Sequence, residues 1–228
     1  MTDQELLPCA ELEPEKTATA AVIWLHGLGA DGNDFLDVVP MLGIPKNIPT
    51  RFVFPHAPVR PVTLNMGHEM RAWYDIEMMD DKRHYRDDDI LLSSRQIYAL
   101  LDREIKRGVA SERIVLAGFS QGGAIALHAG LRYQHRLAGL MALSTYMVRD
   151  DEIDAEQSDA NREVAVFQAH GQYDPMVPFA WGESARDRLI SLGHSVEFHA
   201  YPMEHQVVPE EITAIGDFLR RQLSGANA

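Results

Sequence analysis

The fold is decided by the stretch Gly118-Phe119-Ser120-Gln121-Gly122-Gly123. It follows the apolar run 113–117 and leads into the helix-like run 124–129, so the order is strand, G-x-S-x-G, helix. This is the setting of a nucleophile elbow, where a strained turn holds a serine hydroxyl clear of the chain. Glycines at 118 and 122 remove side chains that would collide across so tight a bend. The alternative is an ordinary turn, and the flanking strand and helix weigh against it.

An elbow serine needs a histidine base and an acid that orients the histidine, and in α/β-hydrolases they follow in the order acid, histidine. Asp174 comes directly after the strand-like run 164–170, and His205 comes after the run 196–201. Ligand sites of open parallel sheets gather at the C-terminal ends of strands, which is where both residues are expected. The sequence therefore predicts Ser120, Asp174 and His205 as catalytic residues. The acids of the polar segment 150–159 are expected to face solvent instead.

Acyl transfer also requires N–H groups that bind the negative charge on the carbonyl oxygen. One donor is the backbone of the residue after the nucleophile, here Gln121, and the other comes from the loop after an early strand. The run 21–25 predicts that strand, and His26-Gly27-Leu28-Gly29-Ala30-Asp31-Gly32 is its loop, with Leu28 as the second donor. A phosphate-binding loop is the alternative. No Gly-Lys-Ser/Thr follows, and G-x-G-x-x-G does not fit.

With these motifs in order, the chain resembles the carboxylesterase/acyl-protein thioesterase family of α/β-hydrolases, also called the phospholipase/carboxylesterase family. The motifs that carry the resemblance run from about residue 20 to the last helix: His26–Asp34, Arg71–Ile76, Gly118–Gly123, His170–Asp174, and His205 before Val207–Glu211. The resemblance implies the same triad, the same two oxyanion donors and no cofactor. Glu204 departs from the small or apolar residue that many members carry there, and residues 201–203 look closer to the bacterial esterase branch. This places ester hydrolysis ahead of an acyl-protein substrate.

The order of apolar runs predicts an α/β-hydrolase fold with a mostly parallel central sheet and helices on both faces. The 228 residues suit a single domain over 1–228, with 1–19 as a loosely packed start. Strands are expected near 20–25, 51–55, 71–76, 112–118, 138–143, 164–170 and 196–201. Helices are expected near 33–41, 87–108, 121–133, 179–193 and 209–224.

Charge and cysteine content exclude several classes of function. The net charge of −13 disfavours nucleic acid and anionic membrane surfaces as partners. Cys9 is the sole cysteine, so neither an intrachain disulfide nor a zinc cysteine cluster can form. The absence of H-E-x-x-H and of paired histidines disfavours a metal hydrolase. No signal peptide or transmembrane segment is visible, which predicts a cytoplasmic protein without integral membrane association.

Residues that select the substrate are sought near the serine. Met70 and Trp73 end a methionine-containing segment, and Met176 and Val177 follow Asp174. Because methionine is flexible and polarizable, it suits an adaptable apolar groove, with segment 61–80 as one wall. Packing of Trp73 into the core is the alternative. Met78 and Met79 follow shortly after Trp73 in this segment, and whether segment 61–80 moves as a lid stays open.

The function predicted from these residues is a serine hydrolase. It would cleave the carboxylic esters of short-to-medium acyl substrates through an acyl-enzyme intermediate. Whether it also cleaves thioesters stays open. A lysophospholipase or an acyl-protein thioesterase would use the same machinery, and a non-catalytic binding module on a hydrolase scaffold is the remote alternative. Acyl length, natural substrate and oligomeric state, including a homodimer, stay open.

Overall fold

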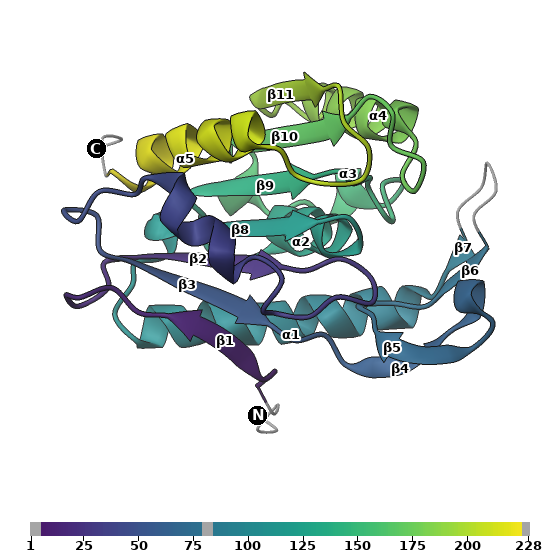
Figure 1. Cartoon of the computed structure of the whole chain (residues 1–228), viewed down its shortest axis with the longest axis horizontal. Coiled ribbons are helices and arrows are strands. Elements are labelled where there is room, and N and C mark those ends of the chain that lie inside the picture. The colour runs from purple at the N-terminus through teal and green to yellow at the C-terminus, as the bar shows by residue number, and fades with distance from the viewer. Residues whose placement is uncertain (1–5, 79–83, 225–228) are drawn as a thin grey trace.

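The computed structural model describes residues 6–78 and 84–224. In this part of the chain the centre is a seven-stranded sheet in the order β1-β3-β2-β8-β9-β10-β11 (Figure 1). All neighbouring strands in it are parallel except the antiparallel pair β1 and β3. The strands are β1 (Cys9–Leu12), β2 (Ala20–Leu25), β3 (Thr50–Pro55), β8 (Ile114–Phe119), β9 (Gly139–Leu143), β10 (Val166–Gly171) and β11 (Val196–Tyr201).

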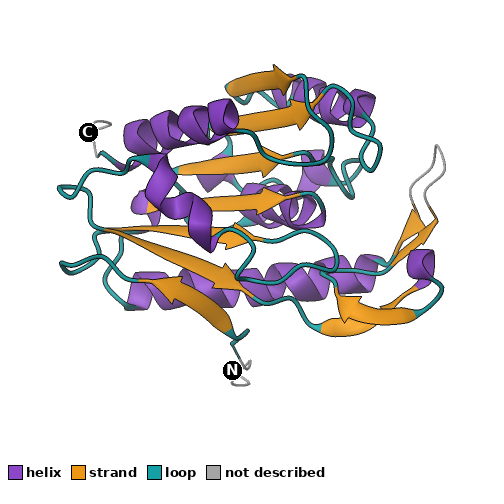
Figure 2. Cartoon of the chain, viewed as in Figure 1, coloured by secondary structure: helices purple, strands orange, loops and turns teal. Residues whose placement is uncertain are grey.

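Helices cover both faces of the sheet, as Figure 2 shows. One face carries α1 (Asp87–Lys106), α2 (Gln121–Arg132) and α4 (Phe179–Ser191). The other carries α5 (Pro209–Leu223) and a 3₁₀ helix at Leu36–Leu42. A short helix, α3 (Ile153–Glu156), follows β9. The predicted α/β-hydrolase architecture is therefore confirmed.

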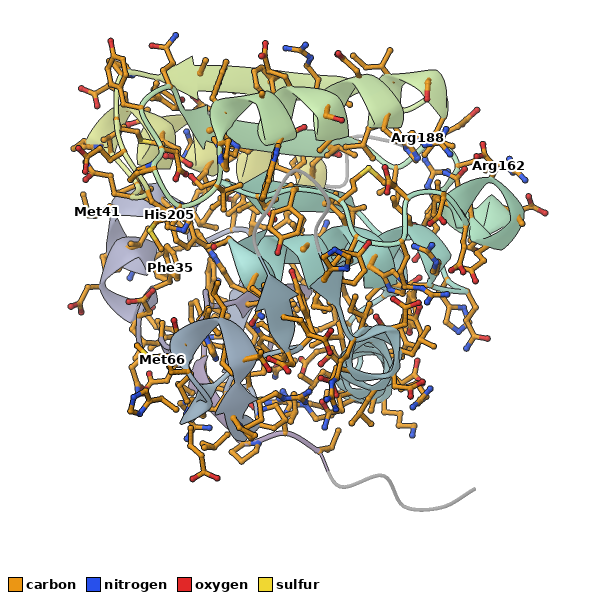
Figure 3. All side chains as sticks on the ribbon, turned by 90° about the vertical axis from the view of Figure 1, so that its right-hand side faces the viewer. Phe35, Met41, Met66, Arg162, Arg188 and His205 are labelled. Atoms are coloured by element: carbon orange, nitrogen blue, oxygen red, sulfur yellow. The ribbon has the colours of Figure 1, made fainter. Side chains whose placement is uncertain are left out.

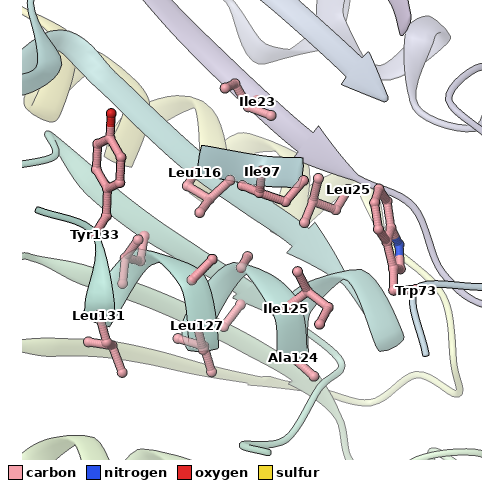
Figure 4. Packing of buried hydrophobic residues seen from close by; sticks show 14 of the residues in the cluster. Ile23, Leu25, Trp73, Ile97, Leu116, Ala124, Ile125, Leu127, Leu131 and Tyr133 are labelled. Atoms are coloured by element: carbon pink, nitrogen blue, oxygen red, sulfur yellow. The ribbon is translucent and has the colours of Figure 1, made fainter. Parts of the chain in front are cut away.

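The strands divide the core in two because successive side chains point to opposite faces. In β2, Ala21, Ile23 and Leu25 pack toward α1 and α2, while Ala20, Val22 and Trp24 pack toward α5. Every residue of β2 is buried, as expected for a parallel strand covered on both sides. Figure 4 shows the first of these two layers, in which Ile125 and Leu127 of α2 lie against the strands.

The expected strand at 71–76 is wrong. Arg71 ends β5 (His68–Arg71), Ile76 begins β6 (Ile76–Met78), and the four residues between them form no strand. β5 pairs with β4 (Val59–Val62) in a hairpin beside the main sheet, and β6 pairs with β7 (His84–Tyr85). Residues 72–75 look strand-like because they are buried, and Trp73 and Tyr74 are fully enclosed. Their apolar character reflects burial in a loop rather than pairing in a sheet.

The start of the chain also differs from the expectation. Residues 9–12 are not loosely packed but form the edge strand β1, and Leu7 and Ala18 are buried. Ion pairs tie the segment to α1, because Glu11 contacts Arg107 at 2.8 Å, and to β3, because Glu13 contacts Arg51 at 2.8 Å. Short strands with few apolar residues give little sequence signal, which is why this edge was missed.

Candidate active site

Ser120 occupies the sharp turn between β8 and α2. Its backbone has φ 54° and ψ −123°, a region that non-glycine residues rarely adopt. Two hydrogen bonds hold the turn: the Ser120 N–H donates to the Leu143 carbonyl at 2.8 Å, and the Thr145 hydroxyl donates to the Ser120 carbonyl at 2.6 Å. The strained serine at a strand-to-helix turn is the geometry that the sequence predicts for an elbow.

The glycines of the turn are required by close approach of the backbone. A Cβ on Gly118 would lie 2.2 Å from the Gly122 carbonyl oxygen. A Cβ on Gly122 would lie 2.5 Å from the carbonyl oxygen of His26. Both separations are far below van der Waals contact, so the G-x-S-x-G spacing reflects steric necessity at this turn.

Asp174 and His205 form a direct hydrogen bond. The Nδ1–H of His205 donates to Oδ2 of Asp174 at 2.6 Å. The other carboxylate oxygen, Oδ1, accepts the backbone N–H groups of Met176 and Val177, each at 2.8 Å. Burial acts to raise the pKa of Asp174, but the hydrogen bonds from His205, Val177 and Met176 outweigh it and hold the pKa below its usual value. The carboxylate is thus ionised and fixed by three donors.

Ser120 and His205 line one pocket, with a volume of about 270 Å³. The His205 ring packs against Phe119 with ring centroids 4.7 Å apart, which places it beside the residue that precedes the serine. The structure therefore brings together all three predicted residues at the C-terminal ends of β8, β10 and β11. The competing acids are exposed, as expected, and none lines this pocket: Asp150, Asp151, Asp154 and Asp159.

The loop after β2 borders the same pocket through Gly27, Leu28 and Ala30. His26 braces this loop, because its Nδ1–H donates to the Gly27 carbonyl at 2.7 Å and its Nε2 accepts the Ala57 N–H at 3.0 Å. Burial lowers the pKa of His26 to about 4, so the ring is neutral and Nε2 stays free to accept. Leu28, the predicted second oxyanion donor, thus belongs to a braced loop at this pocket.

Gln121 also lines the pocket, and its side chain has a role that the sequence did not reveal. Its Oε1 accepts the Trp73 N–H at 2.8 Å, and its Nε2 donates to the Tyr74 carbonyl at 2.7 Å. The indole N–H of Trp73 donates in turn to the His26 carbonyl at 2.9 Å. A buried polar side chain at a helix start needs hydrogen-bond partners, but the sequence does not show which residues provide them.

The four predicted substrate-binding residues separate into two pairs. Met176 and Val177 line the pocket. Met70 and Trp73 do not, so the prediction is corrected for them: Trp73 is fully buried, and the Met70 sulfur accepts a hydrogen bond from the Asn65 amide at 3.1 Å. Segment 61–80 contributes Leu64, Asn65 and Ile76 to the lining, in agreement with its expected place as one wall. Asp34 and Tyr146 also line the pocket and were not predicted. Met79 lies outside the described residues.

No group of three His, Cys, Asp or Glu side chains in residues 6–78 and 84–224 is placed to hold a metal ion. Over the same ranges, no helix has the length and apolar character needed to cross a membrane.

Comparison with known proteins gives consistent relatives. The acyl-protein thioesterase 1 of Neurospora crassa is 39% identical over 215 residues, which span 90% of this chain and 87% of that protein. The acyl-protein thioesterase 1 of Gibberella zeae is 38% identical over 92% of this chain and 93% of its own. The crystal structure of Arabidopsis thaliana SOBER1 superposes with a TM-score of 0.84 at 29% identity, covering 90% of this chain and 99% of that one.

These relatives are fungal and plant proteins, so the expected placement in a bacterial esterase branch has no support. The model of the phospholipase/carboxylesterase family matches residues 9–223, nearly the whole chain. That match covers the elbow, the acid–histidine pair and the loop after β2. The chain therefore belongs to the phospholipase/carboxylesterase family of α/β-hydrolases.

Proposed function

We propose that the chain is a serine hydrolase in which Ser120 is the nucleophile, His205 the general base and Asp174 the residue that orients the base. The observation that carries the proposal is the 2.6 Å bond between His205 and a fully buried Asp174 side chain, at a pocket that Ser120 also lines. Nucleophile, base and orienting acid are the three parts of an acyl-transfer site of this kind.

In the first half of the reaction, His205 Nε2 removes the proton from the Ser120 hydroxyl as the oxygen attacks the acyl carbonyl. Asp174 keeps the Nδ1–H tautomer in place and stabilises the imidazolium that forms. His205 then gives the proton to the departing alcohol or thiol, which leaves an acyl ester on Ser120. Water repeats the sequence and releases the acid.

Two backbone N–H groups are proposed to bind the negative charge that develops on the acyl carbonyl oxygen. Gln121 is the first residue of α2, so its N–H is among the donors at a helix start that have no partner within the helix. Leu28 supplies the second from the opposite loop, which His26 and Trp73 hold in place. Removal of one such donor costs about 10²–10³ in kcat in other hydrolases.

The family makes this chain a hydrolase of the esterase and thioesterase type. Carboxylic esters of short-to-medium acyl chains are the proposed substrates, and thioesters are a second candidate because two relatives at 38–39% identity are acyl-protein thioesterases. A lysophospholipase is the remaining alternative within the family. Matched panels of acyl esters, S-acyl peptides and lysophospholipids would rank the three.

A fluorophosphonate probe tests the nucleophile and separates an enzyme from a binding module. The probe phosphonylates a serine only where a base and an oxyanion site activate the hydroxyl. Intact-protein mass spectrometry should show one adduct, and peptide mapping should place it on Ser120. The Ser120→Ala variant, folded by circular dichroism, should take up no probe. Labelling of that variant at the wild-type rate would refute the proposal.

A further inference from the structure

The pocket that contains Ser120 and His205 has one acidic side chain among its described lining residues. This is the carboxylate of Asp34, and no lysine or arginine of the described chain lines the pocket. The remaining lining is apolar or uncharged. In a mainly apolar binding site, a few polar groups determine which ligand binds, and a single carboxylate can be one of them.

Asp34 has no cation partner among residues 6–78 and 84–224. Within the described residues, neither an ion pair nor a side-chain hydrogen bond engages its carboxylate. The neighbouring Asp31 differs, because its Oδ1 accepts the backbone and side-chain N–H groups of Asn33 at 2.8 and 3.0 Å. Partial burial and the charge of Asp31 raise the pKa of Asp34, since both disfavour a second negative charge there.

Aromatic contacts connect the residue that follows Asp34 with His205. The next residue, Phe35, has its ring centroid 5.7 Å from that of Phe119, and Phe119 lies 4.7 Å from the His205 ring. Figure 3 shows Phe35 and His205 on the same side of the molecule. Asp34 and His205 also line the same pocket, so the carboxylate belongs to the site in which the departing alcohol or thiol is protonated.

Burial separates the two ends of the pocket. Ile76, Tyr146 and Val177 are 8%, 4% and 3% exposed, so they form an inner apolar wall that suits an acyl chain. Asp34 is exposed and belongs to the rim. A leaving group departs toward solvent and must pass this rim, where a carboxylate attracts positive charge and repels negative charge.

We propose that Asp34 is a specificity residue that favours acyl esters and thioesters whose leaving group carries a positive charge near the scissile bond. The proposal rests on the proposed function, because it assigns the leaving-group side from the positions of Ser120 and His205. The feature that such substrates share is a cation close to the ester or thioester group. A small ammonium alcohol and a lysine-rich peptide around an acylated cysteine are two sources of it.

The test compares two butyryl esters of the same shape, one of choline and one of 3,3-dimethylbutanol, in which carbon replaces the charged nitrogen. The quantity measured is the ratio of kcat/KM for the charged ester to that for the neutral ester. Comparing this ratio between variants cancels the different intrinsic reactivities of the esters, and any effect of Asp34 on acyl transfer itself. A second pair of substrates consists of S-butyryl-cysteine peptides flanked by lysine or by serine.

Asp34→Asn should lower the charged-to-neutral ratio about two- to five-fold, the size of one exposed ion pair. Raising the salt concentration should lower the wild-type ratio toward that of the variant. Asp37→Asn is the matched control, since Asp37 is an exposed carboxylate three residues further on that does not line the pocket. Its ratio should equal the wild-type ratio.

A fall in the ratio for either substrate pair supports the proposal, and the pair that responds identifies the source of the cation. Unchanged ratios for both pairs in Asp34→Asn would overturn it, as would an equal fall in Asp37→Asn. Ser120→Ala on the neutral ester separates the two hypotheses. If that variant is inactive while the Asp34 ratios stay constant, only the specificity proposal fails; if it turns over normally, the proposed function fails.

Discussion

The indole N–H of Trp73 donates to the carbonyl oxygen of His26 at 2.9 Å, which links a buried loop to the segment that carries Leu28. Trp73 lies outside the pocket and contributes no atom to its lining. It acts on the proposed oxyanion site by positioning, because His26 precedes Gly27 and Leu28 in the loop.

Trp73→Phe should keep most of the buried ring contacts but remove this hydrogen bond. We expect kcat on a butyryl ester to fall about ten-fold, since small displacements of oxyanion donors are costly. Trp24→Phe is the matched control, because Trp24 is equally buried but its indole N–H makes no hydrogen bond to the described residues. Steady-state kinetics with melting curves would test this, and an equal fall in kcat for both variants would show a general effect of core packing.

Asp174→Asn should reduce kcat about 10⁴-fold while the fold is retained. The asparagine carbonyl would still accept the N–H groups of Met176 and Val177, so its amide group would face His205 Nδ1 as a donor. This forces the proton to Nε2, which then cannot accept the serine proton. Asp154→Asn, at an exposed acid, should retain wild-type kcat. The reverse pattern in the two variants would show that the acid is misassigned.

Glu211 should make stability depend on pH. Its side chain is fully buried in the first turn of α5, and neither carboxyl oxygen has a hydrogen bond of normal geometry within the described chain. Burial raises its pKa to about 8, against the opposing effect of the nearby Val208 N–H. Between the unfolded pKa of about 4.3 and this value, the folded protein holds a proton that the unfolded chain has released, so stability falls as pH rises.

Glu211→Gln should remove this dependence and stabilise the protein at pH 8 by no more than about 5 kcal/mol. At pH 4 the variant and the wild type should differ little. Urea unfolding at several pH values gives the slopes directly, and Glu210→Gln, at an exposed neighbour, is the control. Parallel stability curves for wild type and Glu211→Gln from pH 5 to 8 would contradict the prediction.

Sequence reasoning succeeded where one local signal decides the structure. Uninterrupted apolar runs identify β2 and β8, because strands covered on both faces are mostly apolar. The run of β10 is also recognisable, although it contains the buried Gln168 and His170. It failed at 71–76, where the burial of Trp73 in a loop mimics a strand. The helix expected near 33–41 is present at Leu36–Leu42, but it is a 3₁₀ helix that contains Pro40. Pro40 has no N–H to continue an α-helical ladder.

In the candidate site, too, some residues could be predicted from the sequence and others could not. Ser120, Asp174 and His205 each follow a strand, so chain order and strand ends suffice to place them together. The pocket wall is different, because Asp34, Ile76 and Tyr146 come from segments whose meeting depends on how loops pack across the sheet edge. Gln121 likewise reveals its side-chain partners only in three dimensions.

The central claim is that the Ser120 hydroxyl performs the attack. The most direct measurement is the hydrolysis rate of a butyryl ester by Ser120→Ala, purified free of wild-type protein and folded by circular dichroism. Loss of this hydroxyl should leave the turn intact, because the Ser120 backbone bonds to Leu143 and Thr145 do not use it. We predict a fall in kcat of about 10⁴-fold or more. Retention of more than about a tenth of the wild-type rate would contradict the account.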